Sequence, residues 1–433
     1  MRKLVIFALF AALCGSISAQ STLRSEYILY DAREDALRRD CSKTVNHIPF
    51  APKSMGSLGE MEMYSMEIDV PASWNDYNAY IHLENCYSGY DIAVNGKVIA
   101  SSEDPYTPKD YFISPYLVQG ENKVVLVLRP SACAELNEGV KATMRERFTN
   151  CYIYAQNRAC IYDYDVAIVV GEDKKLHLEL DLIAGNDFNY EETITLGYDI
   201  YTPENKLVDY AVREVIVPGR SRDTLEVRVD LGAELRYLWS AAKPQLYRMT
   251  LYVKRNGKPV EYVPLYVGAG STTFADNAIL RNGKPIVIKS SAYNAASTSA
   301  TTRKEIAALK VKGINTLMPD SPQPLWFYEL CDNLGMYVIE QVSINPTTKS
   351  DDRTVGGTPS NNPQLVDYYI DRVKSCYYRT RNHTCIIAYS LGGKQSGNGY
   401  CMYKAYQWLK EVEKNRPVIC STASGEWNTD ILL

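Results

Sequence analysis

The change in hydrophobic periodicity near residue 270 constrains the fold of this 433-residue chain more than any other feature. From about residue 22 to 268, apolar and polar side chains alternate in short runs, such as 64–70 (YSMEIDV) and 176–183 (LHLELDLI). Alternation with period two, interrupted by Asn-Gly and similar turns, is typical of antiparallel β-sandwiches. This part is too long for one ordinary sandwich, so we divide it near residue 157.

Beyond residue 270, apolar strands alternate with amphipathic helices. The expected order is strand 285–292, helix from Thr302, strand 314–320, helix 325–335, strand 336–343, helix 363–382, strand 384–392, helix 399–415 and strand 416–425. Repeated strand–helix units with buried strands predict a parallel sheet, most simply part of a (β/α) barrel.

Residues 1–20 have the three parts of a secretory signal peptide: a basic start, an apolar stretch over 4–13 and a small-residue end over 16–19. A membrane anchor would need roughly 20 apolar residues. Lipid attachment at Cys14 would favour a small residue where Leu13 stands. We therefore expect soluble export, to the bacterial periplasm, the cell surface or the extracellular space.

Composition excludes some classes of partner. A formal net charge of −4 gives no sign of the strongly basic surface that binds nucleic acid, and no later segment predicts a transmembrane helix. The cysteines form no CxxC pair, so the spacing favours neither a zinc site nor a dithiol redox centre. Cys331 and Cys385 lie in apolar runs and are expected to be buried, while a disulfide or two elsewhere is left open.

Several motifs resemble glycoside hydrolase family 2, most closely its β-galactosidases, and follow one another in the family's order. They lie at 94–130, 238–253, 279–290, 324–340, 381–392 and 398–418. The resemblance implies three domains: a jelly-roll sugar-binding-like domain over 21–157, an immunoglobulin-like β-sandwich over 158–268 and the N-terminal part of a TIM barrel, about five strands, over 269–433.

The resemblance also locates the position of a catalytic acid. Retaining glycosidases need two carboxylates about 5 Å apart, one as acid/base and one as nucleophile. The family's acid/base glutamate follows a Ser-Leu-Gly motif, which here continues as SLGGKQSG over 390–397. The position falls on Lys394 or Gln395. A lysine is protonated near neutrality and an amide has no proton to give, so we predict no catalytic residue here.

Other family positions have changed as well. The segment 290–294 (SSAYN) stands where the family has a Gly- and His-rich stretch, and 318–322 (MPDSP) replaces an Arg-containing loop. After Glu340, Asn345 and Thr347 occupy positions that help to hold a divalent metal in some members. The resemblance therefore implies no metal site and no cofactor.

The nucleophile of the family lies on the seventh barrel strand. A barrel takes about 250 residues, whereas the segment 277–433 extends only just beyond a fifth strand. We expect that the missing strands belong to a longer protein, or that a partner or a second copy supplies them. An open sheet edge invites association, so an envelope partner or self-association at this edge is expected.

Three acids follow strands at the end where barrel sites lie: Asp320, Glu340 and Glu426. Trp427 could serve as a platform for a sugar ring. Together with Lys394 and Gln395, these are the candidate glycan-binding residues; the alternative is that the acids are solvated loop or cap residues and that the tryptophan only packs.

Two functional hypotheses remain. The first is an exported, catalytically inactive protein that binds a glycan or acts as a scaffold in a cell-envelope assembly. The alternative is an exo-β-glycosidase of the β-galactosidase type in carbohydrate metabolism, incomplete here or using displaced carboxylates.

Overall fold

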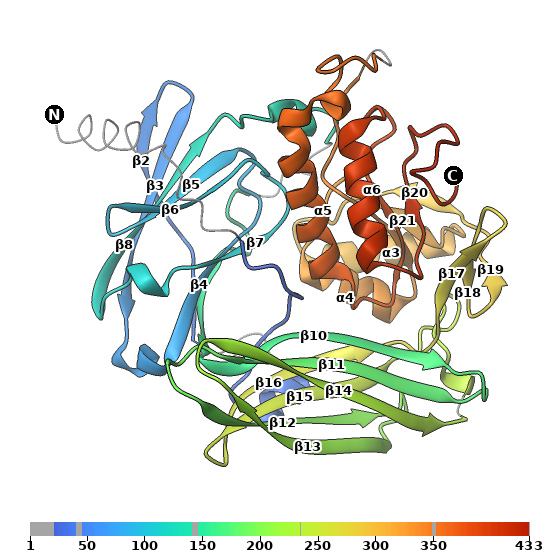
Figure 1. The fold of residues 1–433 in the computed structure, drawn as a ribbon, viewed down its shortest axis with the longest axis horizontal. Helices are drawn as coiled ribbons and strands as arrows, with labels where there is room; N and C mark the ends of the chain where they lie inside the picture. The colour runs from blue at the N-terminus through green and yellow to red at the C-terminus, as the bar shows by residue number, and fades with distance from the viewer. Residues whose placement is uncertain (1–20, 40–45, 141–145, 234, 349–351, 433) are drawn as a thin grey trace. The chain divides into compact units, whose positions relative to one another are not determined.

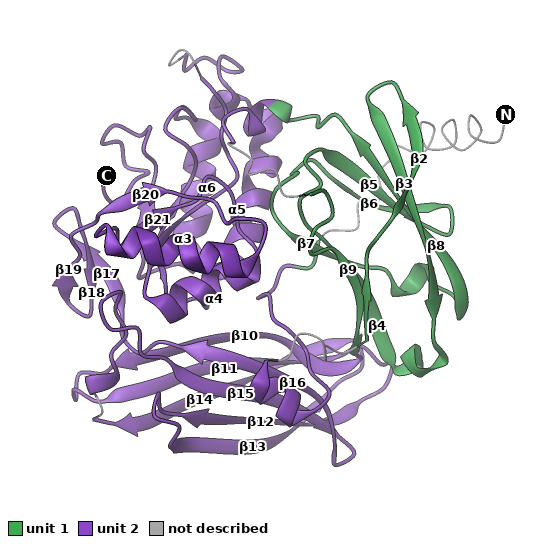
Figure 2. Cartoon of the chain, turned by 180° about the vertical axis from the view of Figure 1, so that it is seen from behind, with its two compact units in different colours: residues 1–22, 46–134, 146–156 green, residues 23–45, 135–145, 157–433 purple. Residues whose placement is uncertain are grey.

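The structure is a computed structural model that describes residues 21–39, 46–140, 146–233, 235–348 and 352–432 (Figure 1). The predicted signal segment 1–20 lies outside the described residues. The chain divides into two compact units (Figure 2). Unit 1 consists of residues 1–22, 46–134 and 146–156, and unit 2 of residues 23–45, 135–145 and 157–433.

Unit 1 is a β-sandwich of two antiparallel sheets. One sheet has the order β1-β9-β4-β7, with strands β1 (His47–Pro49), β9 (Tyr152–Asn157), β4 (Tyr77–Leu83) and β7 (Lys109–Phe112). The other has the order β2-β3-β8-β5-β6, with strands β2 (Lys53–Leu58), β3 (Met61–Val70), β8 (Gly120–Arg129), β5 (Gly89–Val94) and β6 (Lys97–Ser102). Both sheets contribute to one apolar core, including Ile81, Ile92, Leu126 and Ile153, which confirms the predicted sandwich.

The Asn-Gly turn in this unit behaves as the sequence predicts. Val94 pairs with Lys97, and the two residues between them, Asn95 and Gly96, have φ of 50° and 81°. Positive φ at both central positions defines the tight hairpin turn for which Asn-Gly is best suited. Short 3-10 turns complete the unit at η2 (Ala72–Asp76) and η3 (Ser114–Tyr116).

Unit 2 begins its regular structure with helix α2 (Arg33–Arg38) and contains a second β-sandwich. One sheet has the order β10-β11-β14, with strands β10 (Ala159–Val170), β11 (Leu176–Asn186) and β14 (Ser221–Gly232). The other has the order β13-β12-β15-β16, with strands β13 (Leu207–Val217), β12 (Glu192–Tyr201), β15 (Tyr247–Arg255) and β16 (Lys258–Val267). Buried residues alternate along most of β11, as the period-two pattern predicts, whereas β12 alternates only at its start and is buried on both faces over residues 196–200.

The rest of unit 2 is a parallel sheet covered by helices, preceded by a small antiparallel sheet. The small sheet consists of β17 (Thr272–Ala275), β18 (Ala278–Arg281) and β19 (Lys284–Pro285). The parallel sheet keeps the sequence order β20 (Ser290–Ala292), β21 (Thr316–Met318), β22 (Tyr337–Gln341), β23 (Ile386–Ser390) and β24 (Val418–Ile419). The connecting helices are α3 (Ser299–Val311), α4 (Leu325–Leu334), α5 (Val366–Thr380) and α6 (Tyr400–Val412), seen in Figure 1.

This succession of strand–helix units confirms the predicted fold class, a multi-domain β chain followed by an incomplete (β/α) barrel. At two helix ends, local interactions explain where the helix begins or ends. Helix α3 begins three residues before the predicted Thr302, because the Thr298 side chain accepts a hydrogen bond from Thr301 N and caps the helix. Helix α4 ends as predicted at Gly335, whose φ of 72° is readily adopted only by glycine.

Two predicted strands are much shorter than the sequence suggests. Within 285–292 only β20 joins the parallel sheet, because the Asn315 side chain donates to Val287 O and accepts from Lys289 N in place of a strand partner. Within 416–425 only Val418–Ile419 are paired as a strand. Apolar runs predicted both strands, but tertiary hydrogen bonds decide where pairing ends.

The outer edge of β24 is covered by the chain itself. Asp430 N donates to Val418 O (2.8 Å) and its side chain accepts from Val418 N (2.7 Å), while Thr429 Oγ1 accepts from Cys420 N (3.1 Å). Asp430 is in turn held by Tyr406 (2.7 Å) and by an ion pair with Lys410 (3.0 Å). The backbone groups that an open edge would expose at this strand are therefore satisfied.

The cysteines of the described residues are buried free thiols, nine in number. Burial raises the pKa of Cys86, Cys160 and Cys385, so these thiols stay protonated and behave as small apolar side chains. Among the described residues, no helix is both long and apolar enough to cross a membrane.

Candidate functional site

A cavity of about 740 Å³ opens at the carboxyl end of the parallel sheet. Its base is formed by strand side chains that alternate toward it, among them Ala292, Met318, Ile339, Gln341 and Ser390. Its rim is formed by the loops that follow the strands, including Asp320, Asn345, Thr347, Lys394, Gln395 and Ser421. The carboxyl end of a parallel β/α sheet is where such folds bind their ligands, and the volume suits a small molecule.

The amide side chains of Gln341 and Asn345 form part of one wall of the cavity, and Asn294 supports that wall from outside the lining. Gln341 donates from Nε2 to Asp320 O (3.0 Å) and to Asn345 Oδ1 (2.7 Å), and Asn345 Nδ2 donates to Asp320 O (2.9 Å). Asn294 Nδ2 donates to Asp320 Oδ1 (2.7 Å) and its Oδ1 accepts from Asp320 N (3.1 Å). The Asp320 carboxylate is thus held against an amide, and the network fixes the loop after β21 on the loop after β22.

The loop from residue 392 to 399 is packed closely against this wall. A Cβ on Gly392 would lie 2.6 Å from Ile344 O, and one on Gly393 would lie 2.5 Å from Asn345 Oδ1. Only glycine permits this approach, because a side chain would overlap the opposing oxygen. The close packing leaves Lys394 and Gln395 exposed at the rim. These are the two residues at the position where the resemblance to the family predicts the acid/base glutamate.

A segment distant in sequence also reaches the cavity. Gly139 N donates to Asn345 O (2.7 Å), and Asn345 N donates to Leu136 O (2.7 Å), so residues 136–139 run beside the loop after β22. Glu138 accepts a hydrogen bond from Thr347 N (3.3 Å). No pattern in the sequence identifies this segment as part of the site.

Glu340 does not line the cavity, contrary to the expectation from the sequence. Successive side chains of a strand point to opposite faces; Ile339 and Gln341 face the cavity, so Glu340 faces the helices and is fully buried. Its Oε1 accepts from Tyr328 OH (2.7 Å) and lies 3.7 Å from Cys376 Sγ. Burial raises the pKa of Glu340 to about 7, against the opposing effects of Tyr328 and Arg379.

Glu426 and Trp427 are also absent from the cavity lining, so the predicted site divides in two. Asp320, Lys394 and Gln395 line the cavity, whereas Glu426 pairs with Arg353 (3.0 Å) and accepts from Tyr403 OH (2.6 Å). The reason is that the segment after β24 folds back along the edge of the sheet instead of continuing over its end.

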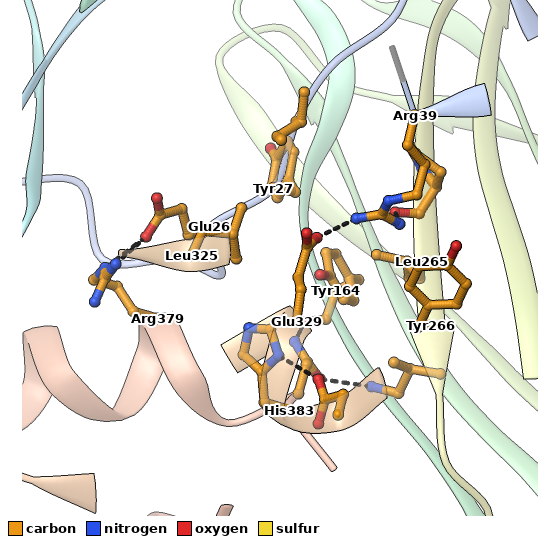
Figure 3. A pocket seen from close by; sticks show the side chains of 15 residues that line it. Glu26, Tyr27, Arg39, Tyr164, Leu265, Tyr266, Leu325, Glu329, Arg379 and His383 are labelled. Atoms are coloured by element: carbon orange, nitrogen blue, oxygen red, sulfur yellow. Dashed lines mark hydrogen bonds and ion pairs between the residues drawn. The ribbon is translucent and has the colours of Figure 1, made fainter. Parts of the chain in front are cut away.

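The only histidine of the barrel segment has a structural position. His383 Nδ1 lies 2.8 Å from Asp332 Oδ2, and its ring lies against Tyr328, with 5.2 Å between ring centroids. It borders a second, small cavity of about 40 Å³ (Figure 3), in which Glu26 pairs with Arg379 and Glu329 with Arg39. This space suits a few water molecules rather than a sugar, and its charged groups are paired.

Sequence reasoning missed the amides Gln341 and Asn345, which line the cavity, as candidate ligand-binding residues. Asn345 was identified only as a departure from a family position, although Gln341 ends β22 and Asn345 lies in the loop that follows it, where amide side chains are themselves a signal for hydrogen-bonding recognition. Ser390, at the end of β23, is a further missed lining residue.

Two β-sandwiches followed by a parallel β/α sheet, with a cavity at its carboxyl end that combines apolar strand side chains and polar loop residues, define a protein with the architecture of a multi-domain glycoside hydrolase. Three models of glycosyl hydrolases family 2 match the chain: the sugar-binding domain over residues 41–156, the family 2 domain over 159–269 and the TIM barrel domain over 274–432. The chain belongs to glycosyl hydrolases family 2.

Curated relatives agree with this assignment, and solved structures share the fold. A β-galactosidase of Priestia megaterium is 26% identical over 388 residues, which cover 86% of this chain and 37% of that protein. The chain thus spans little more than a third of the length of the curated relative. A β-glucuronidase of Bacteroides uniformis has a TM-score of 0.69 at 16% identity, covering 95% of this chain and 54% of that one. A family 2 member from Bacteroides cellulosilyticus has a TM-score of 0.68 at 17% identity, covering 93% of this chain and 57% of that one.

Proposed function

We propose that this chain binds a glycan in the cavity at the carboxyl end of its parallel sheet and does not hydrolyse it. The observation that carries the proposal is the chemical composition of the cavity. Its lining combines apolar strand side chains with amides, hydroxyls and one lysine, and Asp320 is the only carboxylate among the described lining residues. Sugar hydroxyls both donate and accept hydrogen bonds, as amides do, so this lining is suited to recognition.

The same composition argues against retaining hydrolysis. That reaction requires one carboxylic acid to protonate the leaving oxygen and a second carboxylate to attack the anomeric carbon. Lys394 and Gln395 stand at the expected acid/base position, and neither side chain is a carboxylic acid. The Asp320 carboxylate is engaged by Asn294. Glu340 is another of the acids that the sequence predicts at this end of the sheet, but its buried side chain faces away from the cavity.

The binding proposal is tested by calorimetry with β-linked galacto-oligosaccharides. We expect dissociation constants in the millimolar range, which correspond to a binding free energy of about −4 kcal/mol. The variants Lys394→Ala and Gln395→Ala should each bind several-fold more weakly. Lys304→Ala is the matched control, since Lys304 is an exposed lysine of α3 that is not part of the cavity lining. Binding that ignores both rim substitutions, or no binding at all, would contradict the proposal.

The absence of turnover is tested separately. The purified chain is expected to leave aryl β-galactosides, β-glucuronides and β-mannosides uncut above background, because loss of the general acid alone costs about 10²–10⁴-fold in rate. Turnover that survives purification and disappears in Asp320→Asn would favour the alternative, an exo-β-glycosidase of the β-galactosidase type with a displaced acid.

We further infer that the protein is exported and acts outside the cytoplasm, as a glycan-binding or scaffold component of a cell-envelope assembly. The support is the signal-peptide pattern of residues 1–20. N-terminal sequencing of the protein recovered from the periplasm or the medium should find Gln20 as the first residue. Retention in the cytoplasm with an uncleaved N-terminus would contradict this inference.

A further inference from the structure

An exposed tryptophan lies on the loop that follows β24. Trp427 is 54% exposed, unlike the buried Trp239 of the second sandwich. Its indole is supported by two tyrosines of α6: Tyr403 at 5.2 Å and 35° between ring planes, and Tyr406 at 5.6 Å and 82°. The two tyrosines are three residues apart and therefore lie on the same side of the helix. A large apolar ring is thus held in a fixed orientation while much of its surface faces solvent.

Polar groups lie beside this ring in a fixed arrangement. The Glu426 carboxylate pairs with Arg353 (3.0 Å) and accepts from Tyr403 OH (2.6 Å), and Arg353 Nη1 donates to the same hydroxyl (3.2 Å). The hydrogen bond from Tyr403 and the neighbouring Arg353 lower the pKa of Glu426, so the acid is ionised at neutral pH. An aromatic face bordered by an acceptor and a planar donor matches a pyranose, which has an apolar CH face and hydroxyls at its edge.

The loop that carries Trp427 is held in place by hydrogen bonds from residues other than Trp427 itself. Asn428, next to Trp427, is fully buried and exchanges two side-chain hydrogen bonds with Asn398, at 3.1 and 2.8 Å. Thr422 Oγ1 donates to Gly397 O (2.6 Å). The partners at 397 and 398 belong to the loop that carries Lys394 and Gln395 at the cavity rim.

The length of the loop limits the distance between Trp427 and the cavity. Ser421 lines the cavity and Trp427 follows six residues later. A chain segment of that length spans at most about 20 Å even when fully extended. The exposed ring therefore lies within the reach of a short chain of linked sugars whose end occupies the cavity.

We propose that Trp427, with Glu426 and Arg353, forms a second contact site for the same glycan, so that the ligand is an extended oligosaccharide rather than a single sugar. This inference rests on the proposed glycan binding in the cavity. In this proposal the cavity binds the terminal sugar, and Trp427 contacts a sugar further along, so longer oligosaccharides bind more tightly than short ones.

The test is a chain-length series. Galacto-oligosaccharides of increasing length, from one to six units, are titrated by calorimetry into the wild type and into Trp427→Ala. Wild-type affinity should rise with length and then level off. The substitution should lower affinity for the longest members about tenfold, which is the range of one good aromatic contact, and leave the monosaccharide unchanged. Trp427→Phe, which keeps a ring, should restore part of the difference.

Control measurements distinguish a failure of the second contact site from a failure of the proposed glycan binding. Tyr210→Ala removes an exposed aromatic ring of β13 (66% exposed) and should leave the whole series unchanged. Equal affinity at every length, or a length dependence that survives Trp427→Ala, would overturn the second site and leave cavity binding intact. No binding of any member to the wild type would overturn the proposed function, and the second site with it.

Discussion

Replacing the buried Glu340 by glutamine should change how stability depends on pH. Glu340 is fully buried on β22, and burial raises its pKa from 4.5 to about 7. Below pH 4.5, the pKa of this side chain in the unfolded chain, Glu340 is protonated in both the folded and the unfolded protein and does not change the free energy of unfolding. As pH rises toward 7, the unfolded chain loses the proton while the folded chain keeps it, so stability falls. Above pH 7 the penalty is constant.

The expected size follows from the two pKa values. A difference of about 2.5 pH units, at 1.36 kcal/mol per unit, corresponds to about 3 kcal/mol at pH 8. Glutamine has the shape of the protonated acid and can still accept the hydrogen bond from Tyr328 OH. Glu340→Gln should therefore be about as stable as the wild type near pH 4.5 and more stable by about 3 kcal/mol at pH 8.

The measurement is urea denaturation followed by circular dichroism between pH 4.5 and 8, taking the difference between variant and wild type at each pH. The difference cancels every other titrating group. Glu426→Gln serves as the control of opposite sign, because the pKa of Glu426 is lowered and its ionised form is the one that stabilises the fold. A Glu340→Gln difference that does not vary with pH, or that shows destabilisation at pH 8, would refute the assignment of a protonated buried acid.

Three further predictions follow from the same contacts. Asp430→Ala should lower the free energy of unfolding by about 3 kcal/mol, since Val418 N, Tyr406 and Lys410 lose their acceptor; in gel filtration the variant should self-associate through the uncovered β24 edge, and a monomer as stable as the wild type would contradict this. Gly393→Ala should cost about 1–3 kcal/mol and abolish glycan binding, because its Cβ would lie 2.5 Å from Asn345 Oδ1; unchanged calorimetry would count against the close packing. In the native protein Cys86, Cys160 and Cys385 should not react with a thiol reagent at pH 8 until denaturant is added, since burial makes these thiols inaccessible and raises their pKa; peptide mapping that finds them labelled without denaturant would contradict their burial.

The succession of elements was readable from the sequence because it depends on local pattern. Period-two alternation predicts β11 and β12, and Asn95-Gly96 predicts its tight turn. The helical spacing and Gly335 predict α4 and its end. These features depend on residues close in sequence, and neighbouring side chains and backbone preferences suffice to decide them.

The ends of two strands and the covered edge of β24 depend on contacts between residues that are distant in sequence. The Asn315 side chain replaces strand pairing after β19, and Asp430 covers β24 from twelve residues away. Such hydrogen bonds leave no periodic trace, because any polar residue at these positions would look like an ordinary loop residue.

The sequence by itself determined the family architecture and predicted that Lys394 or Gln395 replaces the acid/base glutamate. Only the tertiary structure decided which acids reach the cavity. Strand alternation turns Glu340 toward the helices and Gln341 toward the cavity, and the fold-back after β24 takes Glu426 out of the cavity lining. The physical reason is that side-chain direction depends on one residue of register and on where a loop is anchored, neither of which composition or motif order specifies.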